Sequence, residues 1–220
     1  MSSLHFESIP MKARQKVFGI GFQKTGTSSL GEALETLGYK VIDYYSNDIT
    51  YDELRESYVD RGLELAEEYD AVQDMPWPLI FKQLDQRFPG SKFILTVRSS
   101  ENWYSSMVKH FGTKETPMRQ LTYGKDAPAP VGNKQRYINV FDTHNRGVIE
   151  YFSARPDDLL ILDLEKGEGW AELGRFLNRS DVPQGSFVHA NKAEVRDSIN
   201  YRLRRRLNQA RVKLGMKPRM

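Results

Sequence analysis

Short apolar runs alternate along the chain with longer segments in which apolar side chains recur every three or four residues. Near-continuous apolar runs are typical of strands buried on both faces, and the three-to-four spacing is typical of helices that cover them. The alternation predicts an α/β fold: one domain of three layers, with a mostly parallel five-stranded sheet flanked by helices. The predicted strands are 16–22, 40–45, 70–74, 92–97 and 159–164, and the predicted helices are 27–37, 51–69, 79–88, 101–111, 134–152, 170–177 and 193–214.

Residues 112–132 interrupt this pattern with three prolines and three glycines. Irregular connections of about 20 residues are uncommon unless they serve a function. We therefore predict a lid or substrate loop here, and we expect Phe111 and Tyr123 to line an acceptor pocket.

The chain has 220 residues and no cysteine. This length suits a single domain over 1–220, and the missing cysteine excludes disulfide scaffolds, thiolate zinc sites and cysteine nucleophiles. Residues 1–15 are predicted to be an N-terminal extension, because they lack the apolar core of a secretion signal. No window has the apolar length of a membrane span, so a cytoplasmic protein is expected.

The net charge of +3 averages two unlike regions. Residues 192–220 contain 10 basic and 2 acidic side chains, whereas acidic residues outnumber basic ones in the rest of the chain. Residues 193–220 are predicted to form a basic C-terminal helix, in which Val195, Ile199 and Leu203 recur at helical spacing. This stripe favours packing on the domain, so no nucleic-acid partner is expected, while peripheral contact with an anionic membrane remains open.

The first predicted strand leads through a glycine-containing loop into the first predicted helix. Backbone N–H groups at a helix start attract anions, and Gly26 lets a phosphate approach the backbone closely. Gly21 and Gly26 have the spacing of the nucleoside-triphosphate P-loop, but Thr27 occupies the position of its lysine. Lys24 lies two residues before Gly26 instead, which disfavours a standard ATP or GTP site and suggests a shorter anionic group. The alternative is an ordinary strand-to-helix turn with a solvated lysine.

Residues 24–30, KTGTSSL, resemble the 5′-phosphosulfate-binding loop of the sulfotransferases that use 3′-phosphoadenosine 5′-phosphosulfate (PAPS). Residues 92–106 resemble the 3′-phosphate element of that family, a buried strand ending in an arginine that is followed eight residues later by a serine. The resemblance implies PAPS as the donor, its bisphosphate PAP as the product and no metal. It implies that the donor-binding residues are Lys24, Thr25, Gly26, Thr27, Ser28, Ser29, Arg98 and Ser106.

Arg98 suits a phosphate-binding role, because ligands bind at the carboxyl ends of parallel strands and a guanidinium matches a phosphate bidentately. Its alternative is a surface ion pair with Glu101 or a similar residue. Segments 74–78, 168–177 and 182–191 extend the resemblance over residues 16–192.

Two departures from the family pattern concern the donor site. Ser29 stands where cytosolic members often have a tryptophan that stacks on adenine, and the C-terminal Arg-Lys-Gly phosphate clamp is missing. Lys192 is the nearest candidate for the role of that clamp.

The family resemblance implies transfer of a sulfuryl group from PAPS to a hydroxyl acceptor by in-line displacement. The protein then positions the reactants and stabilises charge, so we expect Lys24 to offset charge on the leaving phosphate and Asp74 to accept the acceptor's proton. Partial burial is expected to raise the pKa of Asp74. The alternative for Asp74 is a helix N-cap, and His110 and His144 are rival bases.

The acceptor is expected to be a small molecule, a carbohydrate or a lipid that carries a hydroxyl group. Two other functions remain. One is a nucleotide or small-metabolite kinase with an atypical P-loop, which would bind ATP with Mg²⁺. The other is a non-catalytic module that binds PAP or phosphate without turnover.

Overall fold

A computed structural model describes residues 15–43, 45 and 49–188 of the chain. All five strands run parallel in one sheet, in the order β2-β3-β1-β4-β5, so the predicted sheet is confirmed and is parallel throughout. The strands are β1 (Val17–Gly19), β2 (Val41–Ile42), β3 (Ala71–Val72), β4 (Lys92–Thr96) and β5 (Leu159–Leu162).

Alternate side chains of the central strands enter the hydrophobic cores on opposite faces of the sheet. Phe18 and Phe93 pack into one core, whereas their neighbours Val17 and Ile94 pack into the other. All four side chains are fully buried. This burial on both faces accounts for the near-continuous apolar runs, because a central strand of a parallel sheet has no face in water.

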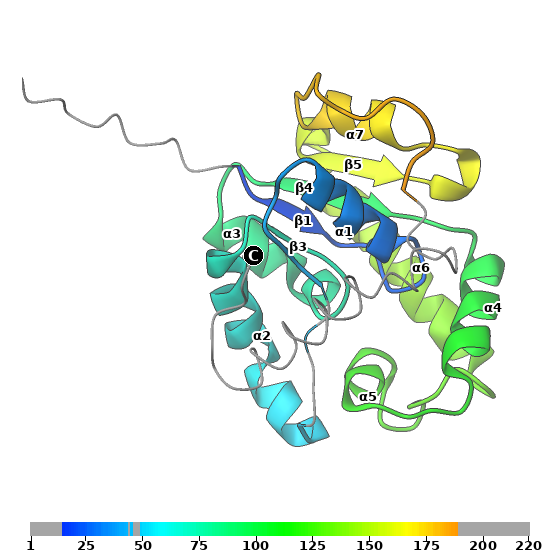
Figure 1. The fold of residues 1–220 in the computed structure, drawn as a ribbon. Coiled ribbons are helices and arrows are strands. Elements are labelled where there is room, and N and C mark those ends of the chain that lie inside the picture. Colours follow the sequence, from blue (N-terminus) through cyan, green and yellow to red (C-terminus); the bar gives the residue numbers. More distant parts are fainter. Residues whose placement is uncertain (1–14, 44, 46–48, 189–220) are drawn as a thin grey trace, which may run out of the picture.

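Helices form the two outer layers (Figure 1). Helices α1 and α7 cover one face, where they share a core with β1, β4 and β5. Helices α2, α3 and α6 cover the other face. The helices are α1 (Thr27–Thr36), α2 (Tyr51–Glu68), α3 (Phe81–Arg87), α4 (Ser100–Phe111), α5 (Pro117–Tyr123), α6 (Lys134–Tyr151) and α7 (Trp170–Phe176), with 3-10 turns η1 (Trp77–Ile80), η2 (Pro156–Asp158) and η3 (Leu164–Lys166).

A third core connects the predicted phosphate-binding loop between β1 and α1 (residues 20–26, called the phosphate loop below) to α4, α5 and α6. Trp103 and Phe141 stack with ring centroids 4.2 Å apart, and Tyr123 and Tyr137 stack at 3.7 Å. Phe22, from the loop after β1, packs in the same cluster. This core places α4, α5 and α6 beside the loop that follows β1.

The segment 112–132 is more regular than its prolines and glycines suggest. Helix α5 begins at Pro117, and the side chain of Thr116 accepts a hydrogen bond from the N–H of Arg119. Proline suits the first turn of a helix, because the N–H that it lacks has no partner there, and threonine is a favoured N-cap. The prediction of an irregular connection is therefore wrong over residues 117–123.

The other predicted elements within the described residues are confirmed, with shorter strands at β1, β2 and β3. The predicted helix at 79–88 begins earlier, as the turn η1, and continues as α3. The predicted basic helix at 193–214, Lys192 and residues 1–14 of the predicted extension lie outside the described residues.

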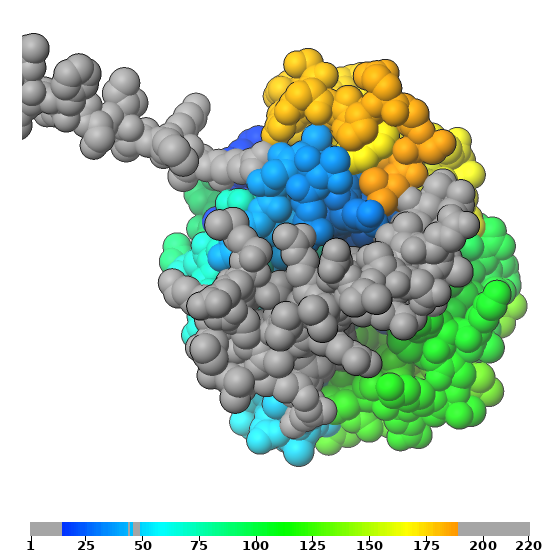
Figure 2. Space-filling view, viewed as in Figure 1, coloured from blue at the N-terminus to red at the C-terminus, as the bar shows by residue number. Residues whose placement is uncertain are grey.

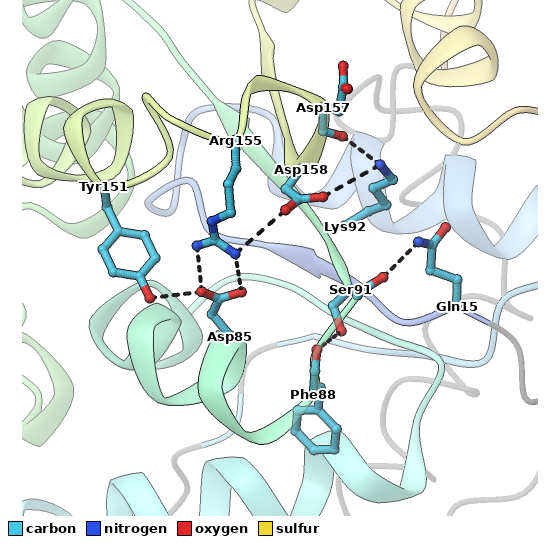
Figure 3. Close-up of polar contacts among 10 residues, drawn as sticks. Gln15, Asp85, Phe88, Ser91, Lys92, Tyr151, Arg155, Asp157 and Asp158 are labelled. Carbon is cyan, nitrogen blue, oxygen red and sulfur yellow. Dashed lines mark hydrogen bonds and ion pairs between the residues drawn. The ribbon is translucent and has the colours of Figure 1, made fainter.

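The amino ends of β4 and β5 carry a network of paired charges (Figure 3). The guanidinium of Arg155 donates to both carboxylate oxygens of Asp85, at 3.1 and 2.6 Å, and the hydroxyl of Tyr151 donates to the same carboxylate at 2.8 Å. Asp158 lies between Arg155 and Lys92, at 3.5 and 3.8 Å. Burial opposes ionisation of Asp85, but the hydrogen bonds from Arg155 and Tyr151 outweigh it and lower the pKa of this carboxyl. This network joins α3, α6 and the sheet.

Candidate functional site

The loop between β1 and α1 presents an open helix start. Gly26 is the N-cap of α1, in the left-handed region at φ 105°, and no side chain caps the helix. Helix α2 differs, because Thr50 and Glu53 form a capping box at its start. The first N–H groups of a helix have no partner within the helix, so the start of α1 offers donors and a positive dipole end to an anion.

Lys24 precedes this helix start in a strained conformation. Its φ is 71°, in a region that side chains other than glycine rarely adopt. Such strain is stored where the surrounding structure imposes the conformation, often at a binding site.

Hydrogen bonds fasten the loop to β4. The hydroxyl of Thr25 lies 2.6 Å from both the carbonyl oxygen of Phe22 and the hydroxyl of Thr96. Gly21 permits this approach, because a Cβ at its position would lie 2.0 Å from the Thr96 hydroxyl oxygen. The first glycine of the motif therefore serves close packing between β1 and β4, while Gly26 serves the turn into α1.

Asp74 lies directly beside the phosphate loop. The hydroxyl of Thr27 donates to Asp74 Oδ2 at 3.2 Å, and the N–H of Met75 donates to Oδ1 at 2.7 Å. Asp74 follows β3 with φ 69° and is half-buried. The N-cap alternative is wrong, because the following turn η1 has Pro76 as its N-cap and no side-chain cap. The structure brings Asp74 and Thr27 together, although 47 residues separate them in the chain.

Arg98 contacts the same loop from the end of β4. Its NH1 group donates to the carbonyl oxygen of Lys24 at 3.4 Å. Its Nε and NH2 groups lie 2.8 and 2.6 Å from one oxygen of Glu165. The sequence left open an ion pair of Arg98 with Glu101 or a similar residue. The structure shows this ion pair with Glu165, whereas Glu101 pairs with Lys134 at 2.8 Å. Arg98 therefore joins the phosphate loop to η3.

Three other residues that are predicted to bind PAPS lie on α1 and α4. Ser28 and Ser29 are in the first turn of α1, where Ser29 is buried and Ser28 is half-buried. Ser106 lies about two turns into α4 and is half-buried, and its side chain makes no hydrogen bond to another described residue. The contacts therefore bring Lys24, Thr27, Asp74 and Arg98 together and leave the role of Ser106 a prediction.

His144, one of the two rival bases, contacts two residues of the phosphate loop. Its ring stacks on Phe22 with centroids 4.4 Å apart, and its Nε2–H donates to the carbonyl oxygen of Ile20 at 2.8 Å. Burial lowers the pKa of His144 to about 4, so the ring is neutral at pH 7. The other rival, His110, is exposed on α4 with its ring against Phe111. Neither contact places a histidine beside Lys24 or Asp74.

Sequence reasoning assigned no role to two residues that the structure places at the site, Gln23 within the loop and Glu165 beside Arg98. Gln23 donates from Nε2 to the hydroxyl of Tyr123 at 3.2 Å, and its backbone carbonyl oxygen accepts from Trp103 Nε1 at 2.9 Å. Burial raises the pKa of Tyr123 well above its usual range, so this phenol stays protonated. Glu165 is the second missed residue. A glutamate directly after a strand has no distinctive sequence signal, because its partner Arg98 lies 67 residues away.

No helix among the described residues combines the length and apolarity needed to cross a membrane. Within the same part of the chain, no group of three or more histidine or acidic side chains lies close enough to hold a metal ion.

The five-stranded parallel sheet, with a glycine-containing loop from β1 into α1, makes this an α/β protein with a P-loop-like fold. The sequence model of the sulfotransferase domain matches residues 16–129 and 121–195, so the chain belongs to the sulfotransferase family. Among individual proteins, the chain is similar to "Ava biosynthesis cluster protein M" of Aspergillus versicolor. The two are 27% identical over 215 residues, covering 79% of this chain and 80% of that protein.

Proposed function

We propose that this protein transfers a sulfuryl group from PAPS to a hydroxyl group of a small-molecule acceptor. One observation supports the proposal: the guanidinium of Arg98 donates to the backbone carbonyl oxygen of Lys24, so two basic residues meet at the start of α1, which has no side-chain cap. Two neighbouring cationic groups suit a donor with separate 5′ and 3′ anionic groups on one nucleoside. Membership of the sulfotransferase family supports the same assignment.

In the proposed reaction the acceptor oxygen attacks sulfur from the side opposite the 5′-phosphate. A new S–O bond forms, the S–O bond to the phosphate breaks, and PAP leaves with the bonding electron pair. Lys24 and the N–H groups at the start of α1 stabilise the charge that develops on the leaving phosphate oxygen. Such donors help most when the fold holds them in place beforehand, which the bonds of Thr25 to Phe22 and Thr96 do here.

Asp74 is proposed to take the proton of the acceptor hydroxyl. Its carboxylate lies at the carboxyl edge of the sheet and within a hydrogen bond of the phosphate loop through Thr27. The two hydrogen bonds that it accepts hold the carboxylate in place, so the reacting hydroxyl meets an oriented base. The neutral, hydrogen-bonded His144 is the weaker candidate for this role.

We propose a biosynthetic small molecule as the acceptor. The name of the similar Aspergillus protein refers to a biosynthesis cluster, and the family implies small acceptors. The loop and helix 112–123, beside the phosphate loop through the contact of Tyr123 with Gln23, are the proposed boundary of the acceptor site.

Calorimetric titration with PAP and with ATP, each with and without Mg²⁺, tests the donor. We expect micromolar binding of PAP that needs no Mg²⁺ and is lost in Arg98→Ala. The matched control is Arg61→Ala, which removes an exposed arginine paired with Glu64 far along α2 from the loop. Tighter binding of ATP than of PAP, with a requirement for Mg²⁺, would establish a kinase and refute the proposal.

Transfer from radiolabelled PAPS to a panel of hydroxylated metabolites tests the chemistry. Asp74→Asn keeps the shape of the side chain and one acceptor oxygen, which can serve either Thr27 or the N–H of Met75, so we expect nearly unchanged affinity for PAP. Transfer should fall by about 100-fold or more, the usual effect of losing a general base. If the variant transfers as fast as the wild type, Asp74 is not the base. If the wild type binds PAP but transfers to no acceptor, the chain is a binding module.

A further inference from the structure

Arg98 is paired with an acidic residue, Glu165, in this structure. Hydrogen bonds within the turn η3 hold Glu165 in that position. Glu165 Oε1 accepts from both Nε and NH2 of Arg98, the edge of the guanidinium that matches a phosphate. Glu165 Oε2 accepts from Asn102 Nδ2 at 3.2 Å. Both oxygens of the carboxylate are therefore engaged by groups at the carboxyl end of β4 and the start of α4.

The turn η3 presents Glu165 in a fixed position. The side chain of Asp163 accepts the N–H of Glu165 at 3.1 Å, and the carboxylate of Glu168 accepts the N–H of Asp163 at 2.7 Å. Leu164, between them, packs on the phosphate loop, since a Cβ on Gly26 would lie 2.4 Å from Leu164 Cδ1. Figure 2 shows the segment that contains this turn (yellow to orange) lying against α1 (blue). The Arg98–Glu165 pair thus belongs to a built contact rather than to two free surface side chains.

We propose that Glu165 competes with the 3′-phosphate of the donor for Arg98 and thereby sets how tightly donor and product are held. This inference rests on the proposed function, in which Arg98 binds that phosphate. A carboxylate at 2.6 Å from the guanidinium partly neutralises it and repels a phosphate that approaches the same group. Bound PAP must displace Glu165 from the paired edge or bind beside a like charge. Either route weakens binding and speeds release of the product.

The variant Glu165→Gln isolates this effect, because glutamine keeps the length of the side chain and an oxygen for Asn102 but removes the charge. We expect PAP to bind about fivefold to tenfold more tightly, the size suited to one half-exposed charge at close range. Adenosine 5′-phosphate lacks the 3′-phosphate, so its affinity should not change. The gain for PAP should shrink at high salt, because salt screens the repulsion.

The control variant Glu101→Gln removes the same charge from the first turn of α4, where Glu101 pairs with Lys134 and not with Arg98. Its affinity for PAP should match that of the wild type. Isothermal titration of the wild type, Glu165→Gln, Glu101→Gln and Arg98→Ala with PAP and adenosine 5′-phosphate completes the comparison.

The outcomes separate the two proposals. Tighter PAP binding in Glu165→Gln alone supports competition. Unchanged or weaker PAP binding in Glu165→Gln, with binding still lost in Arg98→Ala, overturns the competition and leaves the proposed donor site standing. Failure of the wild type to bind PAP more tightly than adenosine 5′-phosphate, or full affinity in Arg98→Ala, refutes the assignment of Arg98 and with it both proposals.

Discussion

At the amino ends of the strands, charged side chains pair with one another, whereas at the carboxyl ends two polar residues have a strained backbone and a helix begins without a side-chain cap. Asp85, Arg155 and Tyr151 form a closed set of hydrogen bonds. At the opposite end, Lys24 and Asp74 have positive φ values, and α1 begins without a side-chain cap. Backbone strain lowers stability, and strained residues cluster at sites of binding and catalysis.

Buried oxygen atoms without a partner among the described residues reinforce this contrast. They include the side-chain carbonyl oxygens of Gln23 and Gln73, which flank Lys24 and Asp74 in the chain. The paired charges at one end of the sheet stabilise the fold, and the strained, uncapped end is the one proposed to bind an anionic ligand. Variants at either end should therefore differ in whether they change stability, activity or both.

Replacing Lys24 at the carboxyl end of the sheet and Lys92 at the amino end should give the largest difference in sulfuryl transfer. Lys24→Ala should lower sulfuryl transfer by about 100-fold to 1,000-fold, the usual cost of losing a group that stabilises transition-state charge. Its free energy of unfolding should hardly change. Lys92→Ala removes contacts with Asp157 and Asp158 and should leave transfer per folded molecule unchanged, while stability falls by about 1 kcal/mol. Equal loss of transfer in both variants would contradict the division. Transfer assays and urea unfolding measure the two effects.

Gly26→Ala should damage both properties. A side chain at φ 105° is strained, and the added Cβ would meet Leu164 at 2.4 Å. Together, strain and overpacking should lower the free energy of unfolding by about 3 kcal/mol and abolish PAP binding. Gly90→Ala is the control, because its φ is also positive but nothing lies within 4 Å of the added Cβ. A similar effect of both variants on PAP binding would show that contact with Leu164 is unimportant.

His144 should make stability depend on pH without taking part in transfer. Its pKa of about 4 in the fold is below the value of 6.5 for an unfolded chain, so the unfolded state binds more protons between these values. Stability should therefore fall by about 2 kcal/mol as the pH falls from 7 to 5. In His144→Gln this slope should disappear, and transfer at pH 7 should stay within a few-fold of the wild type. Loss of transfer with retained PAP binding would instead mark His144 as the base.

Asp85→Asn should have the smallest effect. It weakens the pairing with Arg155 and should lower stability by about 1–2 kcal/mol at pH 7, with no change in transfer. Because the fold lowers the pKa of Asp85, its contribution is complete above the usual carboxyl pKa and is lost as the pH falls below it. The difference in stability between the wild type and the variant should therefore narrow in acid. A constant difference down to pH 2 would refute the role of the charge.

The sheet and its helices followed from the sequence because burial on two faces imposes a visible pattern. The run at 92–97 has apolar residues on both faces, as β4 requires. Helix α5 was not predicted, because the prolines and glycines around it suggested a loop. Thr116 and Pro117 are nevertheless a favoured N-cap and first helical residue. Local composition suggested a loop, while the packing of Tyr123 on Tyr137 supports a helix.

The individual loops of the candidate site could be predicted, but their contacts could not. The glycines and Lys24 mark the phosphate loop, because a turn from strand to helix needs a particular local backbone. The contacts of Thr27 with Asp74 and of Arg98 with Glu165 join distant parts of the chain, and no local pattern encodes such pairs. The sequence likewise offered His144 as a base, since only the fold shows its bond to Ile20.

The phosphate loop is attached to β4 close to the point where the chain continues to Arg98. Thr96, the last residue of β4, holds the loop through Thr25, and Arg98 follows two residues later. Two residues of chain span at most about 7 Å. The short link therefore keeps the backbone of Arg98 near the point where β4 holds the loop. An insertion after Thr96 would lengthen this link and change the spacing that the proposed site offers to the two anionic groups of a donor.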